Sequence, residues 1–99
     1  MHARTTTVKG NPESIDDVVS QVESEVLPLL KEQAGFKGFT LHVDRSGGKV
    51  VGISYWESQE ALDASEEAVK GPREEAARRG GAEGGPDVEH FEVAIDAMA

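Results

Sequence analysis

The sequence contains no cysteine, and this single absence excludes several kinds of chemistry. Disulfide bonds, thiolate zinc sites, iron–sulfur clusters and cysteine nucleophiles all need a thiol, which the chain lacks. Long apolar runs are missing too, because no stretch approaches the roughly 18 residues of a membrane span. The first residues, Met1-His2-Ala3-Arg4, lead into threonines rather than into the apolar core of a signal peptide. We therefore expect a cytoplasmic protein with no membrane partner.

Clusters of basic residues are equally scarce. The longest is the pair Arg78-Arg79, and 19 acidic against 10 basic side chains give a formal net charge of −9. A charge of this sign repels phosphate backbones unless basic residues gather in one place. We therefore expect no nucleic-acid partner.

The length of 99 residues fits one domain, because so short a chain cannot hold two independent cores. Hydrophobic residues make up 37% and charged residues 29% of the chain, which is the balance of a folded globular protein. We predict a single domain over residues 1–99.

The first part of the chain has the pattern of a strand followed by a helix. Residues 4–9 are rich in β-branched side chains, which favours a short strand. Apolar residues then recur at helical spacing from 15 to 30, with Asn11 as the expected N-cap. Pro28 has no backbone donor, so we expect a kink or break near residues 25–27.

Residues 36–44 and 49–56 alternate between apolar and polar side chains, which predicts a β-hairpin. A three-residue loop at 46–48 would pair Val43 with Val51. In this register one face of the hairpin is apolar, and the other is small and polar in its middle. This second face holds Gly38, Thr40, His42, Gly52, Ser54 and Trp56.

The second part of the chain repeats the helix and strand pattern. Ser58 is expected to cap a helix that Gly71-Pro72 ends, with room for a short helical turn over 72–79. Residues 88–97 predict a last strand. The resulting order, βαββαβ, predicts an α+β, ferredoxin-like fold with a four-stranded antiparallel sheet whose first and third strands are central.

Both helices cover the same face of such a sheet, so the other face lacks a helix layer. Two assignments stay open: either the apolar side chains of the hairpin are on the bare face, or the helices cover them and the mixed face is bare. Large apolar side chains gain about 1.5–3 kcal/mol each when they are buried, and a second copy of the chain can cover them. We predict a homodimer.

Few residues are candidates for chemistry. Trp56 stands between the hairpin and the second helix, where its ring can form a wall for a planar ligand or simply pack the helix on the sheet. His42 and His90 can exchange protons near neutral pH, although a strand histidine is more often structural. These two histidines lie on opposite edge strands, about 14 Å apart at a strand spacing of ~4.8 Å, so one chain cannot join them on a metal. We expect no metal site.

Three segments occur in a suggestive order: GFKGF at residues 35–39, VVGISYWES at 50–58 and EAL at 60–62. Together they resemble the antibiotic biosynthesis monooxygenase (ABM) domain of the dimeric α+β barrel superfamily. The resemblance implies a homodimer whose sheets pack face to face, with a pocket between each sheet and its helices. It also implies an activity, since the family includes cofactor-independent oxygenases that convert anthrones or quinols to quinones, and haem-degrading oxygenases.

In the cofactor-independent group the deprotonated substrate itself supplies electrons to dioxygen. That group usually carries an asparagine four positions before the tryptophan, where this chain has Gly52. The haem-degrading group carries a strand-one asparagine and a helix-two histidine about ten positions after the tryptophan, and the latter position here is Glu66. We expect neither haem nor another cofactor.

We predict a monooxygenase-like homodimer that binds a small hydrophobic or aromatic, quinol-like or anthrone-like molecule. Its predicted contacts are Gly38, Thr40, His42, Gly52 and Ser54, with Trp56 as one wall. Of these residues, His42 is the candidate for proton transfer. The alternative is a non-catalytic dimer that binds or carries a ligand, or a structural relative without chemistry.

Overall fold

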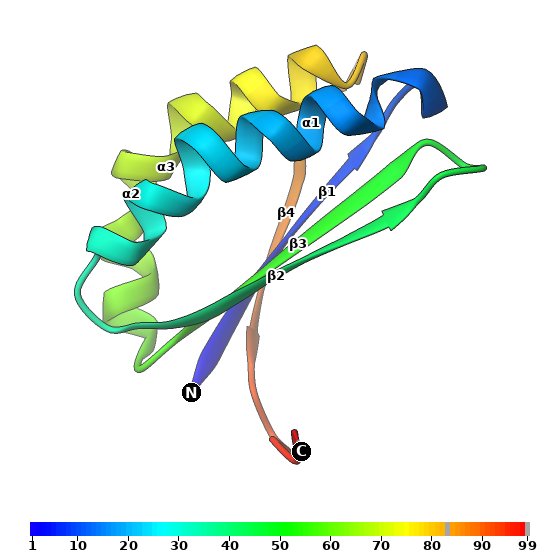
Figure 1. Cartoon of the computed structure of the whole chain (residues 1–99). Helices are drawn as coiled ribbons and strands as arrows, with labels where there is room; N and C mark the ends of the chain where they lie inside the picture. Colours follow the sequence, from blue (N-terminus) through cyan, green and yellow to red (C-terminus); the bar gives the residue numbers. More distant parts are fainter. Residues whose placement is uncertain (83, 99) are drawn as a thin grey trace.

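The computed structural model describes residues 1–82 and 84–98, which form a four-stranded antiparallel sheet with helices on one face (Figure 1). The strands are β1 (His2–Lys9), β2 (Phe36–Asp44), β3 (Lys49–Trp56) and β4 (Asp87–Glu92). Their order in the sheet is β2-β3-β1-β4, so the first and third strands are central. The predicted α+β, ferredoxin-like fold is confirmed.

The first helical segment is irregular close to where Pro28 predicts it. The segment comprises the 3-10 turn η1 (Pro12–Ser14), α1 (Ile15–Gln21), the π-helical turn η2 (Val22–Val26) and α2 (Leu27–Glu32). Pro28 cannot donate to the preceding turn, and the wider π-helical turn before α2 accommodates this missing hydrogen bond. The predicted side-chain cap by Asn11 was wrong: Asn11 precedes η1, but only its backbone carbonyl accepts a hydrogen bond there, from the Ser14 N–H at 3.0 Å.

Helix α3 (Gln59–Arg79) continues past its predicted end. The prediction that Gly71-Pro72 stops this helix was wrong. Val69 before this dipeptide and Ala76 after it both belong to the buried core. Burial of the same helix face on either side outweighs the low helix propensity of glycine and proline. Within residues 1–82 and 84–98, no helix is long and apolar enough to cross a membrane.

Strand β4 is shorter than the predicted strand over residues 88–97. It pairs with β1, and the pairing stops where β1 stops: Glu92 lies opposite His2, and the Val93 N–H donates to the Met1 carbonyl at 2.9 Å. The following residues have no neighbouring strand to continue the ladder, so they leave the sheet.

The hairpin register differs from the predicted one by a single residue. Val43 pairs with Val50 rather than with Val51, and the loop spans residues 45–48 rather than 46–48. Because side chains alternate between the faces of a strand, this shift changes which residues of β2 and β3 share a face.

Two sets of contacts hold the longer loop. The Asp44 carboxylate accepts hydrogen bonds from Ser46 Oγ at 3.0 Å and from the Gly47 N–H at 3.2 Å. The Gly48 carbonyl accepts one from the Gly10 N–H at 2.9 Å, beyond the end of β1. Gly48 has a φ of 69°, which a residue with a side chain rarely adopts. The register therefore depends on a contact outside the hairpin.

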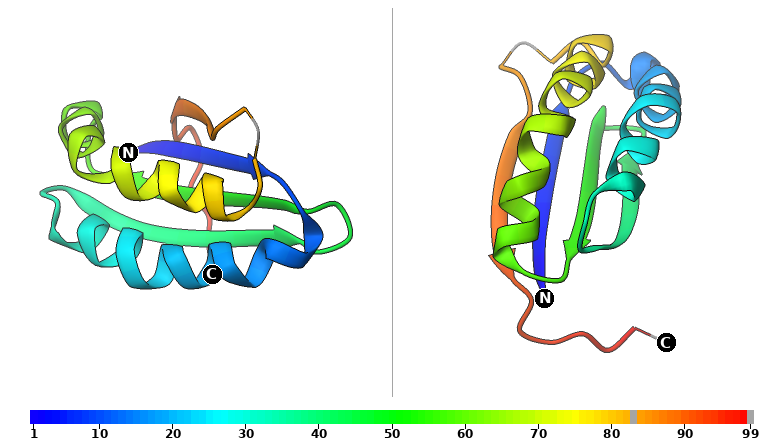
Figure 2. Two further views of the ribbon diagram at one scale, coloured as in Figure 1. Left: turned by 90° about the horizontal axis from the view of Figure 1, so that it is seen from above. Right: turned by 90° about the vertical axis from the view of Figure 1, so that its left-hand side faces the viewer.

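The shifted register divides the apolar side chains of the hairpin between two faces. Phe39, Leu41 and Val43 are on the face that packs against the helices, which we call the helix face. The expectation that the apolar residues stay together on one face was therefore wrong. The other face has no helix layer (Figure 2), and we call it the open face. The open face carries Ala3, Thr5, Thr7, Gly38, Thr40, His42, Val51, Ile53, Tyr55 and Phe91.

The start of α3 offers a direct test of the fold. Ser58 Oγ accepts a hydrogen bond from the Ala61 N–H at 3.1 Å, which confirms the predicted cap. We expect Ser58→Ala to lower the free energy of unfolding by about 1 kcal/mol, because the first turn loses an acceptor. Urea unfolding followed by circular dichroism measures this change. Ser24→Ala, the same substitution at an exposed helical position, is the control and should change stability by less than about 0.5 kcal/mol. Equal effects of the two substitutions would contradict the cap.

Candidate functional site

A narrow cavity lies between the helix face of the sheet and the helix layer. The cavity has a volume of about 50 Å³ and is partly open to solvent. Most of the lining is apolar, and it includes Val22, Val26, Leu30, Phe39, Leu41 and Val69. We call this space the helix–sheet cavity.

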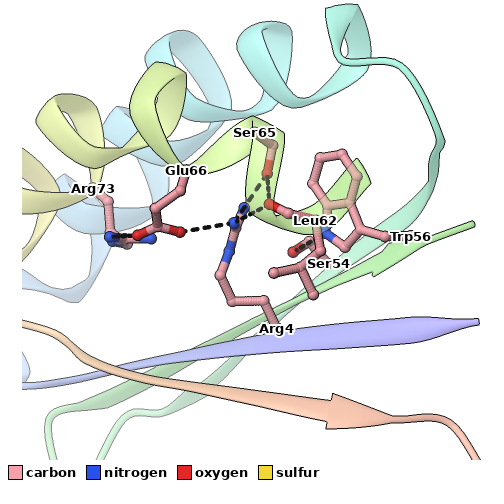
Figure 3. Close-up of polar contacts among 7 residues, drawn as sticks. All are labelled: Arg4, Ser54, Trp56, Leu62, Ser65, Glu66 and Arg73. Carbon is pink, nitrogen blue, oxygen red and sulfur yellow. Dashed lines mark hydrogen bonds and ion pairs between the residues drawn. The ribbon is translucent and has the colours of Figure 1, made fainter. Parts of the chain in front are cut away.

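One wall of the cavity carries a buried positive charge, Arg4 of β1 (Figure 3). Its side chain is 3% exposed, and Nη1 donates to Ser65 Oγ and to Glu66 Oε2, both at 3.0 Å. The guanidinium carbon also lies 5.4 Å from the centroid of the Trp56 ring. Burial lowers the pKa of Arg4, while the Glu66 carboxylate acts in the opposite direction. An arginine still remains protonated at neutral pH.

Glu66 stands between Arg4 and a second arginine of the cavity wall, Arg73 (Figure 3). Its Oε1 accepts a hydrogen bond from Arg73 Nη2. This hydrogen bond is the main reason why the pKa of Glu66 is lowered, and the charges of Arg73, Arg4 and His90 add to it, although burial opposes them. Glu66 is therefore ionised at neutral pH and is a weak base.

The guanidinium of Arg73 has more N–H donors than it has hydrogen-bond acceptors around it. The side chain is 11% exposed and lines the cavity. Its Nε and Nη1 are buried, and neither has a hydrogen-bond partner in the described part of the chain. Buried donors of a charged group are usually paired, so these two nitrogens are the unusual feature of the site.

Three of the residues predicted to form the site lie on the helix face. Gly52 and Ser54 line the cavity, and Ser54 Oγ accepts a hydrogen bond from Trp56 Nε1 at 2.8 Å. Trp56 is 0% exposed and is not among the lining residues. Its ring meets Phe36 edge to face, with centroids 5.6 Å apart. This surrounding is the one expected of a tryptophan that packs α3 on the sheet.

The other three predicted residues lie on the open face. Gly38, Thr40 and His42 alternate along β2 opposite Tyr55, Ile53 and Val51 of β3. His42 is exposed, and its Nε2 lies 3.0 Å from Thr40 Oγ1. The prediction that all six residues share one face was wrong, because it depended on the incorrect register. The proton-transfer role of His42 stays a prediction, and it now requires a substrate on the open face.

The charged residues of the cavity were not among the predicted site residues. One signal was present in the sequence: Arg4 alternates with Thr6 and Val8 along β1, so an arginine shares a face with a core valine. A second was the spacing of Glu66 and Arg73, which puts them two helical turns apart on one side of α3. Neither signal shows that Glu66 and Arg73 lie close to Arg4, because that depends on how α3 packs across β1.

The arrangement can hold a small apolar molecule and orient it by an oxygen atom. Guanidinium groups donate hydrogen bonds and accept none, so they favour carbonyl, enolate, phenolate or carboxylate oxygens. In the described residues, no three histidine or acidic side chains are grouped to hold a metal ion.

Solved structures of known oxygenases share this fold. A monooxygenase from the gene ActVA-Orf6 of Streptomyces coelicolor, in complex with the ligand nanaomycin D, aligns with a TM-score of 0.81 at 20% identity over 99% of this chain and 91% of that chain. SnoaB, a cofactor-independent oxygenase from Streptomyces nogalater, aligns with a TM-score of 0.58 at 23% identity, over 98% of this chain and 93% of that one. At these identities the likeness concerns the fold.

Sequence comparison identifies the family. The uncharacterised protein Rv2557 of Mycobacterium tuberculosis is 38% identical over 94 residues, which are 95% of this chain and 41% of that protein. The uncharacterised Rv2558 of the same organism is 37% identical over 96% of this chain and 39% of its own length. The chain thus spans about 40% of the length of these relatives. The family model described as antibiotic biosynthesis monooxygenase matches residues 1–79. The chain belongs to the antibiotic biosynthesis monooxygenase family.

Proposed function

We propose that this protein is a monooxygenase-like enzyme that oxidises a small aromatic molecule, such as a quinol or an anthrone, in the helix–sheet cavity. The observation that carries the proposal is the cavity itself, whose lining is mostly apolar but includes two arginines, Arg4 and Arg73. Such a combination is typical of small-molecule sites, where apolar walls hold the ligand and a few polar groups orient it. The Streptomyces coelicolor monooxygenase that shares this fold is in complex with the ligand nanaomycin D, which supports a small-molecule ligand for this chain as well.

The proposed reaction takes its electrons from the substrate. Oxidation of an anthrone replaces two hydrogens of a methylene carbon by oxygen, and the other atom of dioxygen leaves as water. The anthrone loses four electrons, which dioxygen accepts, so no further reductant is needed. A quinol that becomes a quinone loses two electrons and two protons, which reduce dioxygen to hydrogen peroxide. The protein then has to bind the substrate, exclude bulk water and stabilise the oxygen anion that forms before the reaction with dioxygen.

Gly52 is the residue whose size matters most in this proposal. It lies on the helix face, and a Cβ added there would come within 3.3 Å of the Phe39 ring, at the cavity wall. Gly38 is a matched position in the same hairpin, because an added Cβ would find Tyr55 Cδ2 at 4.0 Å on the open face. A larger side chain therefore enters the cavity at Gly52 and leaves the cavity unchanged at Gly38.

Oxygen uptake with a panel of anthrones and hydroquinones tests the proposal. We expect turnover by the natural sequence, and a loss of roughly tenfold or more in Gly52→Val, because small displacements of a bound substrate cost this much. Gly38→Val should keep the activity. Thermal unfolding of each variant checks that the fold is intact.

His42→Ala completes this experiment, because it separates the two faces of the sheet. Activity that survives His42→Ala and is lost in Gly52→Val supports the helix–sheet cavity. The reverse pattern would move the chemistry to the open face and support the proton-transfer role of His42. Saturable binding without oxygen uptake would favour the alternative, a non-catalytic ligand-binding member of the family.

We also propose that two copies of the chain associate through the open face. Val51, Ile53 and Tyr55 are only partly buried there, and Phe91 is 48% exposed. Residues 93–98 line a hollow at one end of this face together with Ala3, Ile53 and Tyr55. Exposed apolar side chains grouped on one sheet face mark an interaction surface. A second copy of the chain has an identical apolar face, so the two faces can cover each other in a symmetric dimer.

Sedimentation velocity at micromolar concentration tests this association. We expect a dimer for the natural sequence and a monomer for Ile53→Asp, because a carboxylate on the open face would lose its water in the interface without gaining a partner. Ser20→Asp adds the same charge at an exposed position of α1 and should leave the dimer intact. A natural sequence that sediments as a monomer would overturn the proposal.

A further inference from the structure

The strongest unexplained feature of the molecule is the side chain of Arg73. Its Nη2 donates to Glu66, whereas the N–H groups on Nε and Nη1 are buried and have no acceptor in the described residues. A buried hydrogen-bond donor without an acceptor costs free energy, and more so when the group is charged. The side chain also lines the helix–sheet cavity, although Nε and Nη1 themselves are covered, so a turn of the guanidinium would bring these donors to a ligand there.

The charges around this space do not balance. Arg4 and Arg73 each carry one positive charge, and both are paired with the same carboxylate, Glu66. His90 is the other titratable group close enough to influence Glu66, and its charged form would add to the positive side. The cavity wall is therefore positive by one unit, although the whole chain has a formal net charge of −9. A local excess of this sign in an acidic protein needs a counter-charge.

We infer that the helix–sheet cavity binds its ligand as an organic monoanion, with Arg73 as the group that contacts the anionic oxygen. The ligand class is an apolar, planar body that carries a carboxylate, an ionised enol or a phenolate. The inference deepens the proposed function and rests on the same cavity. Arg73 is the contact residue, and Arg4 is a positioning residue, because its Nη1 donates to Ser65 and to Glu66 and so holds the carboxylate that Arg73 also contacts.

The lining of the cavity excludes more highly charged anions. A phosphate or a dianion needs several donors around it, and the remaining walls of the cavity are made mainly of valine, leucine and phenylalanine side chains. A ligand with one anionic oxygen on an apolar body suits both the arginine wall and the apolar walls of the cavity. Its charge is matched by the one excess positive charge of the wall, and its body is matched by the apolar residues.

Benzoate and benzamide form a matched pair of probes. They have the same ring and nearly the same shape, and they differ in charge. Trp56 is the only tryptophan of the chain and lies beside Arg4, so its fluorescence reports binding without a label. We expect benzoate to bind roughly ten- to a hundredfold more tightly than benzamide, which is the range of a charge-assisted hydrogen bond.

Variants of the charged residues show which side chain causes the preference for benzoate over benzamide. Arg73→Gln should bind benzoate and benzamide equally, whereas Arg73→Lys keeps the charge and should restore part of the preference. Glu66→Gln removes the competing carboxylate and should tighten benzoate binding. Arg78→Gln removes the same charge at an exposed position of α3 and should change nothing. Thermal unfolding, followed in parallel, identifies a variant that has lost its fold.

The outcomes separate this inference from the proposed enzymatic function. Preference for benzoate that depends on Arg73, without oxygen uptake for any quinol or anthrone, supports the anion site and contradicts the oxygenase. Oxygen uptake with equal binding of the two probes supports the oxygenase and overturns the anion site. Equal binding by the natural sequence, no binding of either probe up to its solubility, or an unchanged preference in Arg73→Gln would each overturn the inference.

Discussion

The buried charge of Arg4 is the constraint on which the rest of the site depends. An ionised guanidinium removed from water destabilises the fold unless hydrogen bonds and an opposite charge replace its hydration. Arg4 lies on a central strand, and its partners Ser65 and Glu66 come from α3. Satisfying this charge therefore fixes how α3 crosses the sheet. The same contact holds Glu66 in place, and Glu66 in turn holds Arg73 at the wall of the cavity.

The aromatic corner of the molecule follows from the same arrangement. Trp56 lies beside the guanidinium of Arg4, and its indole N–H is satisfied by Ser54, two residues earlier on the same face of β3. Both positions are buried, and Gly52 continues the same face toward the cavity. The resemblance to quinone-forming oxygenases implies an asparagine at the position of Gly52. With glycine there, this chain has no amide at that position, and the polar residues that line the cavity are Arg4 and Thr6 of β1, Ser54 of β3 and Arg73 of α3.

Local sequence signals predicted most of the fold but little of the site. The elements, their order and the irregularity before Pro28 follow from periodicity, caps and the missing proline donor, which act over a few residues. The hairpin register depends on the Gly10–Gly48 hydrogen bond, which joins segments far apart in sequence. Because the register was shifted by one residue, the predicted site combined residues from both faces. The meeting of Arg4, Glu66 and Arg73 likewise requires β1 and α3 to be packed together, and no local pattern contains that information.

The acidic surface and the positive cavity wall have different effects on an anionic ligand. Over long distances the net charge of −9 repels such a ligand, but salt screens this repulsion beyond about 8–10 Å. Within the cavity, the contact with Arg73 is shielded from water and therefore screened much less. Selectivity for a monoanion then resides in the rate at which the ligand leaves rather than in the rate at which it arrives. Glu66 limits the same selectivity from within, because its charge cancels one of the two arginines. A second negative charge on the ligand would consequently be buried without a positive partner. The Glu66 carboxylate, which holds both arginines in place, therefore also limits the ligand to one negative charge.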